Sequence, residues 1–477
     1  MLERLTTAWG ALDLGRYPED ERDNLRAWDA ADEYLLRHLA ERDISPRGEV
    51  VVLGDRWGAL ATALAAGPEG PPPVSVTDSF LAHRAAQANL ARNGLAPDAV
   101  SFRTPGDRLP DKADILLVRV PKSLAALEHG LHALRPALHA GTVVVGTGMV
   151  KEIHTSTLRL FEQIIGPTRT SLAERKARLI LTTPTRSLDP ARSLDPAPSL
   201  APGPGPSLDP ARSLDPASPL DPARSLDPAS PLDPARSLDP APPLDPVPLL
   251  DPGPSLDPGR FLDPGRFLDP GRSLDPGRSL DPGSDPWPLT YTLDDDAGPV
   301  SGRVVVNHAG VFCADRLDVG TRFLLRHMPV MPEARRIVDL GCGNGVLGLA
   351  AALTHPAAEI VCTDESYAAV ASARATFAAN GVTTGVFQAA DGIGDIAPGS
   401  CDLVLTNPPF HSHQATTEAA ARRMFAGARR ALAPGGELWV VANRHLGHHA
   451  ALRRIFGNCS VAASDRKFTV LRAVRRR

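Results

Sequence analysis

Three short segments in the last third of the chain combine side chains and backbone suited to group-transfer chemistry: 339–345 (DLGCGNG), Asp364 and 407–410 (NPPF). An apolar run precedes the first segment and small residues follow it, which predicts a strand, a glycine turn and a helix. Glycine in such a turn lets the backbone approach a nucleotide cofactor closely. Asp364 ends the next apolar run, where a carboxylate can accept hydrogen bonds from ribose hydroxyls. The glycine turn alone would fit any nucleotide-binding α/β domain.

The NPPF segment makes the set more specific. It closes the apolar run 402–406 and is therefore expected at the carboxyl edge of a parallel sheet, where open α/β folds bind ligands. An exocyclic amine on a base ring is a poor nucleophile because its lone pair is delocalised, and the Asn407 side-chain carbonyl and the Pro408 backbone carbonyl can both accept from its NH2 group. Pro408 and Pro409 fix this backbone in advance, and Phe410 offers a face for a flipped base. Together the motifs predict methyl transfer from S-adenosylmethionine to an amino group.

The N-terminal part of the chain repeats the order of these elements. Its features are a strand over 49–53, a turn over 54–58, a strand ending at Asp78 and a helix closing at Asn93-Gly94. Their counterparts are the strand ending at Leu340, the turn 341–345, Asp364 and the helix closing at Asn380-Gly381. The spacing agrees to within one residue, which suggests a duplication. We therefore expect an α/β fold of two tandem class I (Rossmann-like) methyltransferase domains, of which the N-terminal one is degenerate.

The two halves differ where the chemistry would lie. In the N-terminal turn, Arg56 and Trp57 interrupt the GxGxG spacing and are expected to fill the cofactor site. In place of NPPF this half has RVPK, which begins at Arg119, ends at Lys122 and contains no side-chain carbonyl. Arg119 and Lys122 would present positive charge at the sheet edge, which suits phosphate contact, although two cations can also simply solvate a loop. We expect this half to bind RNA or to act as a scaffold.

A low-complexity segment separates the two halves. From Ser187 to Pro282 a six-residue unit repeats with the consensus (S/P/F)-L-D-P-(A/G)-(R/S/P), and it contains fifteen LDP triplets. Proline in every unit removes a backbone donor and disfavours both helices and β-ladders, while one leucine per unit supplies too little core for a β-solenoid. We predict a disordered linker over 186–286, between domains over 1–185 and 287–477.

The linker also dominates the charge of the chain. The formal net charge is −4, but the segment 187–286 carries sixteen Asp and eight Arg, which leaves +4 for the rest. A mildly basic body is compatible with a phosphate-bearing substrate and equally with an ordinary solvated surface.

Cysteine and histidine usage argues against disulfide and metal frameworks. The five cysteines are odd in number and form no CxxC pair, as expected of reduced thiols in the cytoplasm. The histidines near NPPF and the later group lack acids at ligand spacing, so no metal is expected; they are His411, His413, His445, His448 and His449. Since the sequence contains no signal-peptide core and no run of membrane-spanning length, we expect a cytoplasmic protein without a membrane partner. We also expect a monomer.

Longer segments extend the pattern over nearly the whole chain outside the repeat. They are AWDAADEYLL (27–36), VPKSLAALE (120–128), EIHTSTLRLFE (152–162), KARLI (176–180), GVFCADRLDVGTRFLL (310–325), TNPPFHSHQA (406–415), VVANRHL (440–446) and IFGNCS (455–460). In these segments the chain resembles the duplicated bacterial ribosomal RNA guanine-N2 methyltransferases, most closely the large-subunit (23S) members. The resemblance implies a degenerate N-terminal domain, a catalytic C-terminal domain, S-adenosylmethionine as cofactor and methylation of the 2-amino group of one guanine in 23S rRNA. The repeat departs from the family pattern.

The motifs and the resemblance together suggest the cofactor-binding residues. The turn itself contributes Gly341, Gly343, Asn344 and Gly345. Asp339 is expected to support the turn or to meet the methionine amino group, and Asp364 to hold the ribose. Asp391, which follows another apolar run, is a candidate for the adenine edge or an ordinary surface acid. Asp318 and Gly320, in LDVGTRF, resemble the family's motif near the methionine tail.

The substrate side leaves more than one interpretation open. Lys467 is a candidate for RNA contact, but a lysine precedes the last apolar strand in both halves, which also fits a structural role. NPPF sites also act on protein glutamine or DNA adenine, and the small-subunit (16S) members of the family share the glycine turn and NPPF. A noncatalytic rRNA-binding or assembly factor is the remaining alternative.

Overall fold

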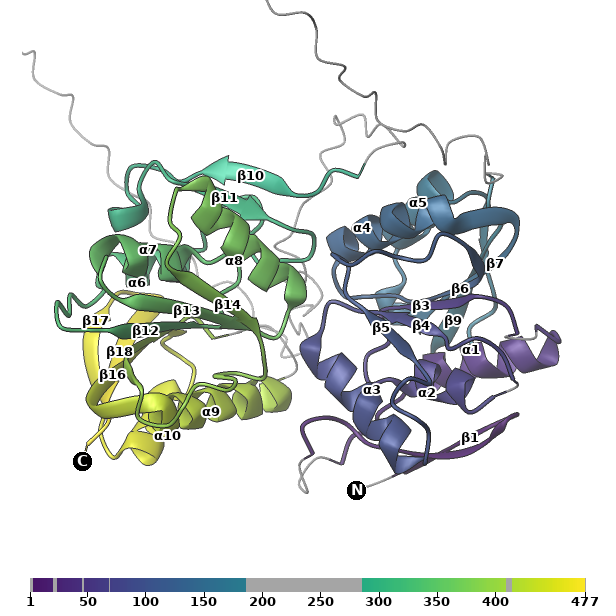
Figure 1. The fold of residues 1–477 in the computed structure, drawn as a ribbon, viewed down its shortest axis with the longest axis horizontal. Coiled ribbons are helices and arrows are strands. Elements are labelled where there is room, and N and C mark those ends of the chain that lie inside the picture. Colours follow the sequence, from purple (N-terminus) through teal and green to yellow (C-terminus); the bar gives the residue numbers. More distant parts are fainter. Residues whose placement is uncertain are drawn as a thin grey trace, which may run out of the picture. The chain divides into compact units, whose positions relative to one another are not determined.

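The computed structural model describes residues 3–19, 24–44, 47–67, 69–185, 285–408 and 414–476. The predicted linker lies outside these residues except for its last two positions. Both halves of the chain that flank it form α/β structure (Figure 1).

The N-terminal half begins with the hairpin β1 (Glu3–Thr7) and β2 (Gly10–Leu14), followed by helix α1 (Ala30–Glu41). The strands of its sheet are β3 (Val50–Leu53), β4 (Val74–Val76), β5 (Ser101–Arg103), β6 (Ala113–Arg119), β7 (Leu138–Met149), β8 (Thr168–Thr170) and β9 (Ala177–Thr182). The helices between them are α2 (Ala59–Ala65), α3 (Phe80–Arg92), α4 (Leu124–Leu134) and α5 (Thr155–Ile164).

The C-terminal half also begins with a hairpin, β10 (Leu289–Thr292) and β11 (Val304–Asn307), followed by helix α6 (Val319–Leu325). Its sheet contains β12 (Arg336–Leu340), β13 (Glu359–Asp364), β14 (Gly385–Ala389), β15 (Cys401–Thr406), β16 (Leu432–Asn443), β17 (Ser460–Ser464) and β18 (Phe468–Val474). Its remaining helices are α7 (Val346–Thr354), α8 (Tyr367–Ala379), α9 (Gln414–Ala431) and α10 (His448–Phe456). No helix in the described part of the chain has the length and apolar character needed to cross a membrane.

The two sheets share one topology. Their strand orders are β5-β4-β3-β6-β7-β9-β8 and β14-β13-β12-β15-β16-β18-β17, which correspond strand by strand. In each sheet the first five strands of this order pair in parallel, and each of the last two strands is antiparallel to the strand before it in the order. Helices cover both faces of each sheet (Figure 1). Parallel strands covered on both faces appear as continuous apolar runs, such as VVVL in β3. The expected fold of two tandem Rossmann-like domains is confirmed.

Helices α3 and α8 follow the same local rules. Each has thirteen residues and begins after a serine, Ser79 or Ser366, whose hydroxyl accepts a backbone N–H three residues on. Each ends at an asparagine, Asn93 or Asn380, followed by a glycine with φ of +70°. The matching caps support the duplication, and the predicted helix ends at the two Asn-Gly pairs are confirmed.

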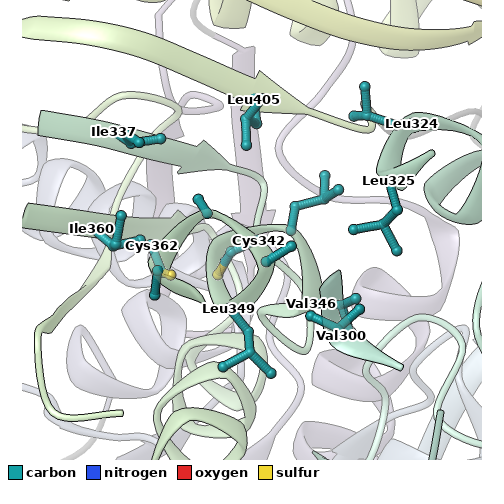
Figure 2. Close-up of a cluster of buried hydrophobic side chains, with 14 of the residues drawn as sticks. Val300, Leu324, Leu325, Ile337, Cys342, Val346, Leu349, Ile360, Cys362 and Leu405 are labelled. Atoms are coloured by element: carbon teal, nitrogen blue, oxygen red, sulfur yellow. The ribbon is translucent and has the colours of Figure 1, made fainter. Parts of the chain in front are cut away.

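One buried cluster of the C-terminal half connects the sheet to α6 and α7 (Figure 2). It contains Ile337, Ile360 and Leu405 of the sheet, Leu349 of α7, and Leu324 and Leu325 of α6. Cys342, inside the glycine turn, belongs to the same cluster. Each fully buried aliphatic side chain contributes about 1.5–3 kcal/mol. This packing fixes α6 and the glycine turn relative to the sheet.

Candidate active site

The glycine turn follows β12 and is tied to the neighbouring strand β13. The backbone N–H groups of Gly341 and Cys342 both donate to the carbonyl of Thr363, at 2.8 and 3.0 Å. The N–H of Gly343 donates to Asp364 Oδ2 at 2.9 Å. The structure therefore brings the turn and Asp364 together at one edge of the sheet.

The three glycines of the turn have different reasons to be glycine. Gly341, Gly343 and Gly345 have φ values of +72°, +53° and +79°, which side chains rarely adopt. A Cβ at Gly345 would lie 2.7 Å from the Cβ of Ala373, so this glycine allows α7 to pack on α8. A Cβ at Gly343 would meet no atom of the described chain within 4 Å. The backbone is therefore open to a ligand at Gly343, whereas Gly345 serves the fold.

Asp339 lies one residue before the end of β12 and is 1% exposed. Its Oδ2 accepts from the Gly348 N–H, in the first turn of α7, at 2.7 Å. Its Oδ1 has no hydrogen-bond partner within the described ranges. Burial, reinforced by the charge of Asp364, raises the pKa of Asp339 to about 8. Asp339 therefore supports the helix and keeps one buried oxygen available to a donor such as an ammonium group.

Asn344, the last variable residue of the turn, contacts the end of the β10–β11 hairpin. Its Nδ2 donates to Asn307 Oδ1 at 3.0 Å. Asn307 is fully buried, and its own Nδ2 finds no acceptor in the part of the chain that the structure describes. The hairpin therefore supplies a buried donor beside the turn, in a residue that the sequence did not single out.

Asn407 follows β15 directly, and β15 lies next to β12 in parallel register. The Thr406 hydroxyl donates to the Leu340 carbonyl at 2.6 Å, which joins the ends of these two strands. The glycine turn after β12 and Asn407 after β15 are therefore neighbours at the carboxyl edge of the sheet. In this class of fold ligands bind at that edge.

The side chain of Asn407 makes two hydrogen bonds to the start of α6. Its Nδ2 donates to Asp318 Oδ2 at 3.0 Å and to Thr321 Oγ1 at 2.9 Å. Its Oδ1 is buried and, among the residues that the structure describes, has no hydrogen-bond partner. Leaving a buried carbonyl without a donor is unfavourable. This oxygen is therefore suited to accept an amine N–H from a substrate.

Asp318 and Gly320 support this arrangement from α6. Asp318 is the N-cap of the helix, and its Oδ2 also accepts from the Thr321 N–H at 2.8 Å. A Cβ at Gly320 would lie 3.0 Å from that same oxygen and 3.1 Å from the Phe468 ring, so a side chain there would crowd the cap. The sequence placed both residues near the methionine tail. In the structure Asp318 contacts Asn407, and Gly320 leaves room for that cap.

Asp391 and Lys467 lie farther out. Asp391 follows β14 by two residues, and the Arg423 Nε lies 3.9 Å from its Oδ1. Lys467 is exposed just before β18, with its ammonium 5.1 Å from the centre of the Phe468 ring. Both side chains reach solvent and are accessible to a ligand at the same end of the sheet.

The rest of the predicted catalytic loop is only partly described. Pro408 is buried, while Pro409, Phe410, His411 and His413 lie outside the described residues. Of the later histidines, His448 is buried against the Phe425 ring. Within the described residues, no group of three or more His, Cys, Asp or Glu side chains is arranged to hold a metal ion.

Arg119, at the end of β6 in the N-terminal half, is 1% exposed. Its guanidinium donates to Asp29 Oδ2 at 2.6 Å, to Asp32 Oδ1 at 3.1 Å and to Glu152 Oε2 at 3.2 Å. Arg56 of the N-terminal turn reaches the same group, 3.0 Å from Glu152 and 3.6 Å from Asp29. This burial contradicts the expectation that Arg119 presents its charge for phosphate contact, because internal carboxylates already neutralise it.

Two other expectations for this half have different outcomes. Lys122 is exposed, as phosphate contact requires. The match of Asp78 with Asp364 is one residue off. Counted back from the N-caps Ser79 and Ser366, the counterpart of Asp364 is Thr77. The N-terminal half therefore has a hydroxyl where the C-terminal half has its candidate ribose-binding carboxylate.

Sequence reasoning missed Asn307 and Thr321, and it missed the acids that surround Arg119. A signal for the latter was present, because WDAADEYLL and LDVGTRFLL align without a gap. That alignment places Asp29 at the position of Asp318 and Asp32 at the position of Thr321. No comparable signal marks Asn307, which ends a short apolar strand.

Comparisons with known proteins agree with this organisation. The family models that match are the RLMG N-terminal domain, over residues 2–186, and the Methyltransferase small domain, over residues 302–472. Among solved structures, the T. thermophilus 16S rRNA N2 methyltransferase RsmC, in complex with AdoMet and guanosine, has a TM-score of 0.61 at 18% identity. The match covers 100% of this chain and 98% of that chain. At this identity the likeness shows the fold alone.

The duplicated sheet, the glycine turn and the asparagine at the end of β15 define an S-adenosylmethionine-dependent methyltransferase of the Rossmann-like class. The ribosomal RNA large subunit methyltransferase G of Streptomyces avermitilis is 51% identical over 100% of both chains. The proteins of that name in Streptomyces coelicolor and Aeromonas hydrophila are 52% and 37% identical, over 99% of this chain and 100% and 99% of theirs. The chain belongs to the ribosomal RNA large subunit methyltransferase G family. The resemblance inferred from the motifs is confirmed.

Proposed function

We propose that this protein transfers the methyl group of S-adenosylmethionine to the exocyclic 2-amino group of a guanine in 23S rRNA. The observation that carries the proposal is the Asn407 amide. Both of its N–H bonds are engaged at the start of α6, and its buried carbonyl oxygen has no hydrogen-bond partner within the described residues. The names of the relatives support rRNA of the large subunit as the substrate.

The residues at the turn are suited to S-adenosylmethionine, which supplies an electrophilic methyl group on a sulfonium when bound. Gly343 offers open backbone, Asp339 Oδ1 a buried acceptor and Asn307 Nδ2 a buried donor. Asp364 already accepts from two backbone N–H groups, but each carboxylate oxygen has a second lone pair for a ribose hydroxyl. We assign Gly341, Asn344 and Gly345 to the walls of this site and Asp391 to its adenine end.

The strand end acts on the nucleophile. Asn407 Oδ1 and the Pro408 carbonyl would accept the two N–H bonds of the guanine amine, which favours a pyramidal nitrogen and directs its lone pair at the methyl carbon. A nitrogen–carbon bond then forms as the sulfur–carbon bond breaks. The excess proton on nitrogen leaves to solvent, so no strong base is needed. Pro409 would stiffen this segment and Phe410 would stack on the extruded base.

RNA contact is proposed for two exposed lysines. The Lys467 ammonium covers the Phe468 ring, and Phe468 packs against Gly320 at the start of α6, so Lys467 lies close to the catalytic strand end. Lys122 is an exposed cation that follows β6 in the N-terminal half. Lysines contribute mainly non-specific phosphate contacts. We further propose that the protein acts in the cytoplasm as a monomer.

Nucleoside mass spectrometry of the two rRNAs, purified separately from a strain that lacks this protein, tests the proposal. We expect the loss of one N2-methylguanosine from 23S rRNA and its return when the purified protein and S-adenosylmethionine are added. A loss confined to 16S rRNA would assign the protein to the other subunit. Unchanged methylation of both rRNAs, with normal ribosome assembly, would overturn the enzymatic proposal.

A further inference from the structure

We infer that Asp318 and Thr321 are positioning residues that hold the Asn407 amide in the one orientation that presents its carbonyl to the substrate amine. The inference rests on the proposed function, since it presumes that Asn407 accepts from the guanine 2-amino group. An asparagine amide has two orientations of nearly equal shape that exchange its oxygen and nitrogen. Only one is productive here, because in the other an NH2 group would face the NH2 group of the substrate.

The chemistry of the partners selects the productive orientation. A carboxylate is an acceptor only, so Asp318 Oδ2 must face the Asn407 nitrogen, which lies 3.0 Å away. The Thr321 hydroxyl lies 2.9 Å from the same nitrogen and 3.4 Å from Asp318 Oδ2. It can therefore accept from Asn407 while its own hydrogen points toward the carboxylate. Both amide hydrogens are engaged, and the carbonyl is left facing the site.

The start of α6 is rigid enough for this role. Asp318 Oδ2 is held by the Thr321 N–H at 2.8 Å as the cap of the helix. Leu324 and Leu325, at the end of the helix, are buried in the cluster that contains Cys342 of the glycine turn (Figure 2). Leu317, directly before the cap, belongs to the same cluster. A side chain fixed by packing and by a second hydrogen bond positions its partner more precisely than a mobile one.

The N-terminal half has the same connection between helix cap and strand end, although it lacks the candidate catalytic asparagine. There the cap residue Asp29 and its neighbour Asp32 hold Arg119, at the same strand end, by the same route. A purely structural tie between helix cap and strand end is therefore the competing explanation. A decisive test must measure something other than folding.

Three variants at the cap separate the two explanations. Asp318→Ser keeps a capping oxygen but ends one bond nearer the backbone and no longer reaches Asn407. Asp318→Asn keeps an acceptor for both donors. Thr321→Val removes only the hydroxyl. We expect kcat to fall about 100-fold in Asp318→Ser, as for a misplaced reacting group, less in Thr321→Val, and least in Asp318→Asn. The Kd for S-adenosylmethionine and the thermal midpoint should stay near the wild-type values.

The Asn407→Asp variant provides a second test, in which the effect of Asp318→Asn on kcat should change direction. In Asn407→Asp the strand end carries two acceptor oxygens, so no orientation needs to be selected, and the new carboxylate faces that of Asp318. Adding Asp318→Asn should then raise kcat, although the same change lowers it slightly when Asn407 is present. Calorimetry with S-adenosylmethionine and thermal melting accompany each rate measurement.

Specific results would overturn the inference. Equal losses of kcat in Asp318→Ser and Asp318→Asn would show that the carboxylate acts by its charge. A weakening of S-adenosylmethionine binding that matches the fall in kcat would place Asp318 on the cofactor. Full activity of Asn407→Ala would instead remove the catalytic assignment of Asn407 within the proposed function, whatever the Asp318 variants do.

Discussion

The ends of β6 and β15 are the same place in two copies of one fold, and they differ in what they leave unsatisfied. At the end of β15 the neutral amide of Asn407 donates its N–H bonds to Asp318 and Thr321, and its buried carbonyl remains available to a ligand. At β6 a guanidinium is enclosed by Asp29, Asp32 and other acids of its own domain. The buried charge of Arg119 is neutralised within its own domain, whereas the buried acceptor of Asn407 is available to a ligand.

The glycine turns show the same separation of roles. Both halves keep glycine at the position that packs two helices, Gly58 against Ala86 and Gly345 against Ala373. The inner position, open at Gly343, is Arg56 in the N-terminal half. Positions that the fold requires have remained, and the position that only a cofactor requires has changed.

The buried end of the first strand follows this rule as well. Asp339 in β12 corresponds to Val52 in β3, and both are buried. The valine is the residue expected inside a parallel sheet. The aspartate has a desolvation cost that its hydrogen bond with the Gly348 N–H offsets only in part, because its Oδ1 has no partner within the described residues.

The largest effect on activity is expected when the Asn407 side chain after β15 is removed. Asn407→Ala should lower methyl transfer to 23S rRNA by about 1,000-fold, as for loss of a group that stabilises developing charge. The thermal midpoint and the Kd for S-adenosylmethionine should change little, because the side chain is outside the cofactor turn. Radiolabelled methyl transfer and calorimetry provide the measurements. Undiminished turnover would rule out the catalytic role.

The corresponding change in the other copy should affect stability. Arg119→Met leaves the buried Asp32 without its cation, while Arg56 still reaches Asp29 and Glu152, and should lower the free energy of unfolding by about 3–5 kcal/mol. The matched control is Arg108→Met, whose pair with Asp111 is exposed and should contribute less than about 1 kcal/mol. Urea unfolding compares the two variants. Equal effects would show that the buried cluster has no special weight.

Introducing the arginine of the N-terminal turn into the C-terminal glycine turn should block the proposed cofactor site. Gly343→Arg places a side chain at a φ of +53° and in open space meant for the cofactor. S-adenosylmethionine affinity should fall about tenfold or more, which is about 1.4 kcal/mol, because the arginine side chain would occupy the open space beside the backbone. The reverse change, Arg56→Gly, should not create binding, because Thr77 supplies no carboxylate. Calorimetry would contradict this comparison if Arg56→Gly restored a second site.

The pH dependence of stability should respond to Asp339. Folding raises the pKa of Asp339 from 3.8 to about 8, so the folded state binds its proton more tightly and this contribution to stability declines as pH rises between those values. Asp339→Asn removes the titration and should flatten the decline between pH 5 and pH 8. Urea unfolding without cofactor at several pH values measures it. The matched control is Val52→Thr, which adds a buried hydroxyl but no titrating group and should leave the slope unchanged.

The smallest effects are expected at the two exposed lysines. Lys467→Glu should weaken rRNA binding and reduce the salt slope of the affinity by about one, while S-adenosylmethionine binding is unchanged. Lys122→Glu makes the same change at the exposed lysine after β6 in the N-terminal half. Comparable losses would indicate that both halves contact RNA, and a loss in Lys467→Glu alone would assign the N-terminal half to a scaffold. No change in either variant would remove both proposed contacts.

Local patterns were sufficient to predict the two sheets, the glycine turns and the helix ends. Apolar runs, glycine spacing and Asn-Gly pairs act within a few residues, so the sequence displays them directly. The neighbouring positions of the glycine turn and Asn407 could also be predicted, because parallel strands end at one sheet edge.

The partners of the strand-end residues could not be predicted by local reasoning. Asn407 contacts Asp318, which lies 89 positions earlier, and Arg119 contacts Asp29, which lies 90 positions earlier. Exposure was therefore assumed for Arg119 from its place after a strand, and long-range acids reversed that assumption. The match of Asp78 with Asp364 failed for a different reason, since a carboxylate one residue nearer the cap gives almost the same spacing.

One oxygen, Asp318 Oδ2, both ends the loop before α6 and grips the Asn407 nitrogen. A molecule in which this helix has formed has therefore already turned the amide the correct way, so newly made enzyme needs no separate maturation step at this residue. If the first turn of α6 opened, the Asn407 amide would lose this contact and the activity would fall, although the rest of the protein stayed folded.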